Sequence, residues 1–202
     1  MKAVRVVEQK KAAAVGEYGF LAMLGYPSAE VKQASAPEVI KELACLIREA
    51  KPRCLYTHNL ADKHETHVAT ALKVVAALRT LNPEERPEKV FGCEVWRDLD
   101  WLNDEEKILL DCGAHPNLMR CLSAVFDSQI SGGKRYDLAA EGRRLANATF
   151  SQSHACDTYS ALNYAMDLTP LMDDNVDIAE YVTGYIDRFK EQVKGLIERY
   201  TK

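Results

Sequence analysis

The chain has 202 residues and a formal net charge of −4, and 47% of its residues are hydrophobic, as in ordinary soluble globular proteins. This slightly acidic balance excludes a broad nucleic-acid surface, which requires a basic face. The sequence holds no run of about 18 apolar residues, so we predict no transmembrane helix. The length suffices for one sizeable hydrophobic core, and we predict a single domain over residues 1–202.

The six cysteines indicate where the protein resides. None are spaced as C-x-x-C, and several lie in apolar runs such as 43–46. We predict buried free thiols in a reducing compartment. The N-terminus lacks the apolar core of a signal peptide, and together these features favour a cytoplasmic location.

The first half of the chain alternates between helical and extended patterns. In chain order it predicts a helix over 2–15, a buried strand over 20–24, a helix over 37–51 begun by a Ser35–Glu38 capping box, a strand over 54–57, a polar loop over 58–65, a helix over 68–78 and a strand over 90–96. Such alternation predicts an α/β fold with a mainly parallel, Rossmann-like sheet and flanking helices. Reactive groups in these sheets lie at the carboxyl ends of strands, where the loop at His58 begins.

The second half is less regular. It predicts a strand over 107–112, one helix from Leu118 that ends before Gly132, a helix over 138–150 and a last helix from about residue 174. We expect the last helix to direct its periodic apolar side chains inward, namely Val182, Ile186, Phe189, Val193 and Ile197.

The loop over 56–67 carries the strongest chemical signal. Its residues His58, His64 and His67 are three of the five histidines in the chain, and Asp62 lies among them. Neutral imidazoles and a carboxylate that converge can bind zinc. His64 and His67 are three residues apart, which differs from the H-E-x-x-H spacing of metalloproteases. The alternative is a solvated helix cap with unrelated histidines.

This loop resembles that of the PIG-L/LmbE-like zinc-dependent N-deacetylases, which read T-H-N-x-x-D-x-H-x-D-H between a strand and a helix. The matching residues are Thr57, His58, Asn59, Asp62, His64 and His67. The resemblance extends to the R-x-x-E helix at 5–8, the L-G-Y-P turn at 24–27 and the S-Q pair at 128–129. It therefore covers most of the chain.

The resemblance implies roles for individual residues. His67 corresponds to the zinc-binding histidine, and His64 to the histidine beside the metal that stabilises the oxyanion or protonates the leaving amine. Arg5 corresponds to an arginine that lines the substrate site, while Asp62 and His58 lie near the centre. Zn²⁺ in such a site activates water and polarises the amide carbonyl.

The sequence departs from the family pattern at residues that would belong to the zinc site. The family's A-H-P-D-D motif, which supplies further zinc ligands and the general base, has no counterpart before His58, so we expect its N-terminal strands to be missing and the Zn²⁺ site to be incomplete. Thr66 replaces the usual aspartate before the last histidine. Neither His115, in Ala-His-Pro-Asn, nor His154, in an H-x-x-D spacing, is expected to replace the motif.

These observations favour a zinc-dependent hydrolase that removes an acyl group from an N-acyl amino sugar or a similar small amide. We expect the chain by itself to be weakly active or inactive. The alternatives are a non-catalytic or truncated family member that acts in binding or subunit interaction, and an α/β domain whose loop is a coincidence. The expected partner is a small molecule, with no nucleic acid and no membrane span; many relatives assemble, so a homo-oligomer stays open.

Overall fold

The computed structural model describes residues 2–201 and divides the chain into two compact units. The first unit runs to Gly25 and resumes over Leu109–Asn163, and the second comprises Tyr26–Ile108 and continues from Tyr164. The chain thus leaves and re-enters the second unit. The expectation of one domain over residues 1–202 stays a prediction.

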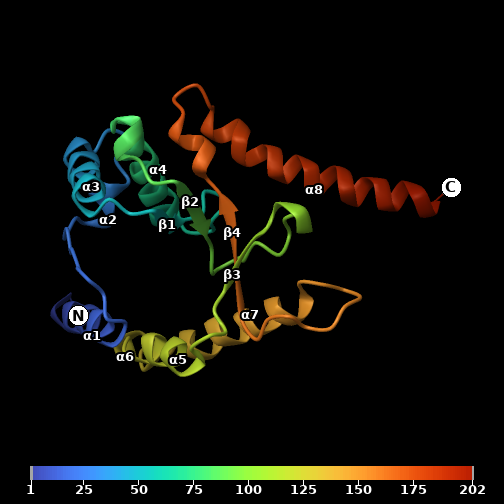
Figure 1. The fold of residues 1–202 in the computed structure, drawn as a ribbon, viewed down its shortest axis with the longest axis horizontal. Coiled ribbons are helices and arrows are strands. Elements are labelled where there is room, and N and C mark those ends of the chain that lie inside the picture. Colours follow the sequence, from blue (N-terminus) through green and yellow to red (C-terminus); the bar gives the residue numbers. More distant parts are fainter. Residues whose placement is uncertain (1, 202) are drawn as a thin grey trace. The chain divides into compact units, whose positions relative to one another are not determined.

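The first unit is mainly helical (Figure 1). It contains α1 (Lys2–Val15), α5 (Pro116–Ala124), α6 (Asp127–Ile130) and α7 (Tyr136–Phe150), and α1 packs on α5 and α6 while α7 packs on both. The bounds predicted for α1 are confirmed. The single helix predicted from Leu118 is wrong, because Phe126 leaves the helical conformation with φ −88° and ψ 43° and separates α5 from α6.

Two motifs that resemble the family meet inside the first unit. Glu8 of α1 is only 5% exposed, although it is charged. Its carboxylate accepts hydrogen bonds from the backbone N–H and the hydroxyl of Ser128 on α6, both at 2.7 Å. This pairing satisfies a buried carboxylate and joins α1 to α6.

The second unit contains α2 (Ser28–Val31), α3 (Pro37–Ala50), α4 (Glu65–Arg79) and α8 (Ile178–Thr201). The helices α3 and α4 pack on each other, and α4 packs on the first strand. The predicted Ser35–Glu38 capping box is wrong, since Ala36 occupies the N-cap position and makes no side-chain cap hydrogen bond.

The strands are β1 (Cys54–His58), β2 (Lys89–Cys93), β3 (Ile108–Asp111) and β4 (Leu162–Asp167). Within residues 2–201 they form one sheet in the order β1-β2-β4-β3 (Figure 1). β1 and β2 are parallel, with His58 aligned to Cys93, whereas β2 and β4 are antiparallel. The α/β class is therefore confirmed, and the expectation of a mainly parallel sheet is corrected to a mixed one.

Two apolar segments differ from the prediction in their secondary structure or burial. The segment 20–24 forms no strand, and Phe20 is 62% exposed. In α8 the buried residues are Val182 and Tyr185, so the inward orientation predicted for Ile186, Val193 and Ile197 is wrong.

All six cysteines are free, as predicted, but none of them is fully buried. Cys45, Cys121 and Cys156 are exposed, and Cys54, Cys93 and Cys112 are half-buried. Among residues 2–201, no helix has both the length and the apolarity needed to cross a membrane.

Candidate metal centre

The histidine loop begins where β1 ends and continues to the start of α4. Asn59, which is fully buried, holds the beginning of this loop against β2. Its backbone N–H donates to the carbonyl of Cys93 at 2.9 Å, and its side-chain amide donates to the carbonyl of Gly92 at 3.3 Å. Asn59 Oδ1 also accepts the N–H of Ala61 at 2.7 Å. The loop is therefore fixed at the carboxyl edge of the parallel strands, as the α/β pattern predicts.

Asp62 organises the rest of the loop. Its side chain is only 1% exposed, whereas that of His67 is 28% exposed. Asp62 Oδ1 accepts the backbone N–H of His64 at 2.7 Å, and Oδ2 lies 2.8 Å from Nδ1 of His67. One carboxylate thus fixes both the turn before α4 and the orientation of a ring on its first turn.

The imidazole rings lie against one another. The His58 and His67 rings are stacked, with centroids 3.9 Å apart and planes inclined by 3°, and the His64 ring lies 4.7 Å from that of His67. Burial lowers the pKa of His58, and the neighbouring His67 lowers it further. The His58 ring is therefore disposed to be neutral, which is the form that binds metals.

The donor atoms of His58, Asp62 and His67 all lie within 4.8 Å of one another. Two imidazoles and one carboxylate are a donor set found in catalytic zinc sites, which keep a further position for water. Stacked rings place their lone pairs in separate parallel planes, so one ring must rotate before both can point to one ion. The residues fit a divalent cation by type and spacing, and sequence reasoning assigned the metal role to His67 alone.

Glu94 is a neighbour that the sequence analysis missed. It follows β2 directly, is only 2% exposed, and accepts the backbone N–H groups of Trp96 and Arg97 at 2.7 and 2.6 Å. Burial raises the pKa of its carboxyl, and the charge of Asp62 contributes in the same direction. The loop that Glu94 holds brings the Trp96 ring to 6.0 Å from that of His64. The sequence could have indicated Glu94, because this residue lies at the carboxyl end of a predicted parallel strand.

The other residues singled out from the sequence lie elsewhere. Arg5 is exposed on α1, in the first unit. His115 is the N-cap residue of α5, and His154 lies in an exposed turn. Among the described residues no metal-binding cluster includes either histidine. The substrate-binding role of Arg5 stays a prediction.

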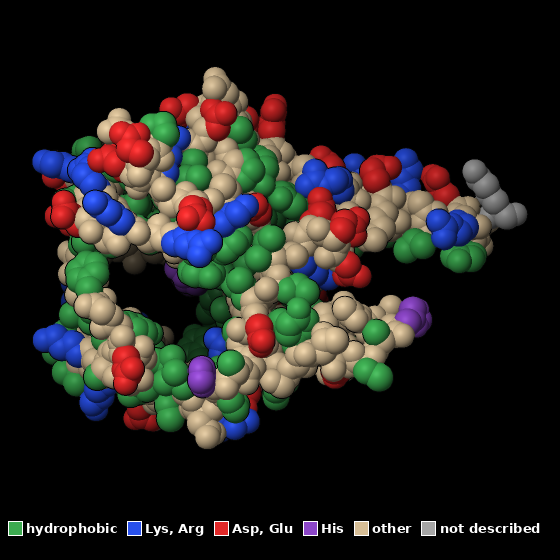
Figure 2. All heavy atoms as spheres, in the orientation of Figure 1, with side chains coloured by type: hydrophobic (Ala, Val, Ile, Leu, Met, Phe, Trp, Pro, Cys, Tyr) green, Lys and Arg blue, Asp and Glu red, His purple; other side chains and the backbone are tan. Residues whose placement is uncertain are grey.

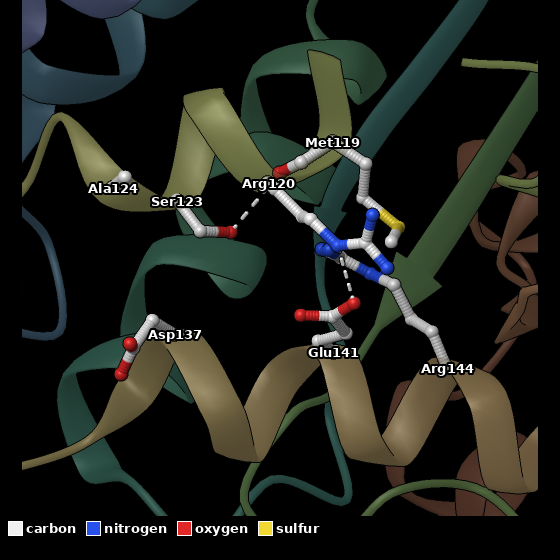
Figure 3. Close-up of a pocket in the computed structure, with 7 residues that line it drawn as sticks. All are labelled: Met119, Arg120, Ser123, Ala124, Asp137, Glu141 and Arg144. Atoms are coloured by element: carbon white, nitrogen blue, oxygen red, sulfur yellow. Dashed lines mark hydrogen bonds and ion pairs between the residues drawn. The ribbon is translucent and has the colours of Figure 1, made fainter. Parts of the chain in front are cut away.

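A pocket of about 220 Å³ lies between α5 and α7 in the first unit. Figure 3 shows the side chains that line it: Met119, Arg120, Ser123, Ala124, Asp137, Glu141 and Arg144. Nε of Arg120 donates to Glu141 at 2.6 Å. The pocket shares no residue with the histidine loop.

Comparison with known proteins relates the chain to others by fold and by sequence. The fold is similar to that of the conserved protein TT1542 from Thermus thermophilus, with a TM-score of 0.64, 20% identity, and coverage of 83% of this chain and 74% of that one. No curated protein sequence matches the chain. The family model PIG-L, described as GlcNAc-PI de-N-acetylase, matches residues 1–78, which include α1 and the whole histidine loop. Residues 1–78 are therefore similar to the PIG-L family, as the motifs in this part of the chain predict.

Proposed function

We propose that this protein is a zinc-dependent hydrolase that removes an acyl group from an N-acyl amino sugar or a similar small amide. The observation that carries the proposal is the cluster of His58, Asp62 and His67 at the carboxyl edge of β1. The family match supports a deacetylase-type hydrolase in general. The proposal goes further than this match in two respects: it names zinc as the metal and an N-acyl amino sugar or similar small amide as the substrate.

In this proposal His58, Asp62 and His67 hold the ion. A bound Zn²⁺ would polarise the amide carbonyl and lower the pKa of a water molecule. His64 is exposed and its ring lies against that of His67, so it can donate a proton to the leaving amine beside the metal. Glu94 acts through the backbone of its loop, since both of its oxygens accept N–H groups. Substrate binding by Arg5 is part of the same proposal.

Zinc titration of the purified chain tests the metal centre. Isothermal titration calorimetry should show one Zn²⁺ bound per chain, and His67→Ala and His58→Ala should each remove most of this affinity. His115→Ala is the matched control, because this histidine lies at the N-cap position of α5, outside the cluster. Affinity that survives His67→Ala would show that the ligand assignment is wrong.

Amide hydrolysis tests the reaction separately. The zinc-loaded chain should release free amine from N-acetylglucosamine or from N-acetylglucosaminyl-inositol, detected with an amine-reactive dye. We expect a low rate, because the A-H-P-D-D motif that supplies the general base has no counterpart before His58. His64→Ala should keep zinc affinity and lower the rate by roughly 10²–10⁴-fold, the usual contribution of a general acid. A zinc-loaded chain that cleaves neither probe would contradict the hydrolase proposal and favour a binding role.

A further inference from the structure

Two arginines, one from each helix, line the pocket between α5 and α7. Arg120 belongs to α5 and Arg144 to α7, and both border the space of about 220 Å³. Figure 3 shows the two side chains extending into this space from their helices. All residues of the lining lie in the first unit, so the pocket is formed by one compact body.

One of these arginines has a carboxylate partner. Nε of Arg120 donates to Oε1 of Glu141 at 2.6 Å. Glu141 lies three residues before Arg144 on α7, a spacing at which an ion pair within the helix can form. The carboxylate is bound to Arg120 instead, and so it neutralises the arginine of the other helix.

The second acid of the pocket, Asp137, is paired with an arginine outside the lining. Its carboxylate accepts hydrogen bonds from Nε of Arg135 at 3.0 Å and from Nη2 at 2.7 Å. These hydrogen bonds lower the pKa of Asp137 to about 2. Asp137 therefore adds no uncompensated negative charge to the pocket.

Arg144 is left with a positive charge that no carboxylate balances. The residue is half-buried, and within residues 2–201 its side chain makes neither a hydrogen bond nor an ion pair. A guanidinium carries five N–H donors and stays charged in proteins. Partial withdrawal of such a group from water costs free energy unless an acceptor replaces the water. An anion in the pocket would provide that acceptor.

The lining favours one kind of anion. A doubly charged phosphate would approach the carboxylates of Asp137 and Glu141, whereas an organic carboxylate brings one negative charge and matches the fork of a guanidinium. Met119 and Ala124 supply an apolar part of the lining that can contact a short alkyl group. Pockets for drug-sized ligands occupy roughly 300–1,000 Å³, so this smaller space suits a ligand of few heavy atoms.

The distribution of surface charge favours a small anion over a polyanion. On the face that Figure 2 shows, lysine and arginine side chains are interspersed with aspartate and glutamate side chains. A polyanion such as nucleic acid requires a continuous basic patch, and the chain has a formal net charge of −4.

We propose that the pocket between α5 and α7 binds a short-chain monocarboxylate, which accepts hydrogen bonds from the guanidinium of Arg144 and places its alkyl group against Met119. The site is independent of the proposed hydrolase activity, because its lining shares no residue with the histidine loop.

NMR titration of the full chain with sodium propionate tests the proposal. In isotope-labelled protein the Nε–H signals report individual arginine side chains, and Arg144→Gln identifies the signal of Arg144 by its loss. In the wild type this signal should shift saturably, with a dissociation constant on the order of 1 mM for so small a ligand. Propionamide, which has the same shape without the charge, and sodium chloride at equal ionic strength should cause no comparable shift.

Variants with opposite expected effects locate the ligand, and the backbone amide signal of Ser123 reports binding in each of them. Arg144→Gln should weaken propionate binding by about tenfold or more, as loss of a charged hydrogen-bond partner does. Glu141→Gln should strengthen binding by about threefold, because it removes a like charge and releases the arginine that this carboxylate holds. Arg143→Gln is the matched control on the same helix, outside the lining, and should leave the affinity unchanged.

Several results would overturn the proposal. These are the absence of a saturable shift, equal shifts with propionate and propionamide, and an unchanged affinity in Arg144→Gln. Binding of inorganic phosphate as tight as that of propionate would show that the site does not select a monocarboxylate. Circular dichroism verifies that each variant is folded. If Arg144→Gln does not fold, Glu141→Gln decides, since unchanged or weaker binding in that variant also contradicts the proposal.

Discussion

At the scale of single residues, one carboxylate determines the geometry of the candidate metal centre. Asp62 holds the backbone of His64 with one oxygen and the ring of His67 with the other. The spacing of the motif predicts that His64 and His67 lie on neighbouring positions. It does not predict that the His58 ring stacks on His67, because that contact depends on how the loop returns to β1.

Replacement of Asp62 by asparagine should weaken zinc binding without unfolding the chain. Asparagine keeps an oxygen for the N–H of His64 but places an amide nitrogen where Nδ1 of His67 has its acceptor. Loss of a hydrogen-bond partner of a ligating histidine by itself costs about 10–100-fold in metal affinity. Because Asp62 is also one of the three proposed ligands, we expect at least this loss. Competition with a chromogenic chelator measures the zinc affinity of the variant and of the wild type. The control is Glu65→Gln, which removes the charge of a side chain that is 84% exposed at the start of α4.

The lowered pKa of His58 gives the stability of the protein a pH dependence of known sign. Its folded-state pKa lies below the ordinary value of 6.5 because of burial, so below 6.5 the unfolded chain binds the proton more readily than the folded one. Its contribution is fully present above that value and is lost as the pH falls toward the folded-state pKa. We therefore expect metal-free protein to lose stability on acidification below pH 6.5.

Urea unfolding at a series of pH values checks this expectation. In His58→Asn the free energy of unfolding should depend less steeply on pH in that range, whereas His154→Asn, which alters an exposed histidine, should follow the wild type. If the free energy of unfolding of His58→Asn depended on pH as that of the wild type does, the predicted role of His58 would be wrong.

At the scale of elements, the sequence predicts best where one periodicity is clear. The bounds of α1 and α3 and the succession β1, loop, α4 follow from apolar spacing, glycine and proline. β4 could not be predicted, because its residues are buried on both faces and show no alternation. The short apolar run at 20–24 has the composition of a strand but pairs with no strand of the described sheet, and all of its residues except Leu21 are exposed.

Close packing at the end of β2 couples the sheet to the histidine loop. A Cβ added at Gly92 would lie 2.7 Å from Leu168 Cδ1 and 3.1 Å from Asn59 Nδ2, and both of these residues are fully buried. Gly92→Ala should therefore lower the free energy of unfolding by about 1–3 kcal/mol, as overpacking of a core does. Displacement of Asn59 should also weaken zinc binding.

Gly142 provides the matched comparison. It lies in α7, and a Cβ there would meet nothing within 4 Å. Gly142→Ala should raise the free energy of unfolding by about 1 kcal/mol through helix propensity. Chemical denaturation measures both variants, and equal effects of the same sign at the two glycines would contradict the packing argument.

At the scale of the whole molecule, the candidate centre belongs to one unit alone. His58, Asp62, His67 and both tryptophans, Trp96 and Trp101, lie within Tyr26–Ile108. Tryptophan fluorescence therefore reports the second unit, whereas circular dichroism reports the helices of both. This division could not be read from the sequence, because residues 109–163 interrupt the second unit without any change in composition that marks a linker.

Zinc should raise the thermal midpoint that tryptophan fluorescence detects. A ligand that binds only the folded state at a hundred times its Kd adds about 2.7 kcal/mol to the free energy of unfolding. The variant His67→Ala should show no such shift, and a chelator should reverse it in the wild type. A shift of equal size in His67→Ala would place the bound ion elsewhere.

The donors of the candidate centre are contributed by ten consecutive residues, from His58 to His67. Bringing the ends of so short a segment together costs little chain entropy, so the same side chains can meet around an ion before the rest of the protein has folded. A denatured chain would then retain some affinity for zinc, and the observed stabilisation would fall below the value for an ion that binds the native state alone. We therefore expect zinc binding to depend only in part on the folded structure.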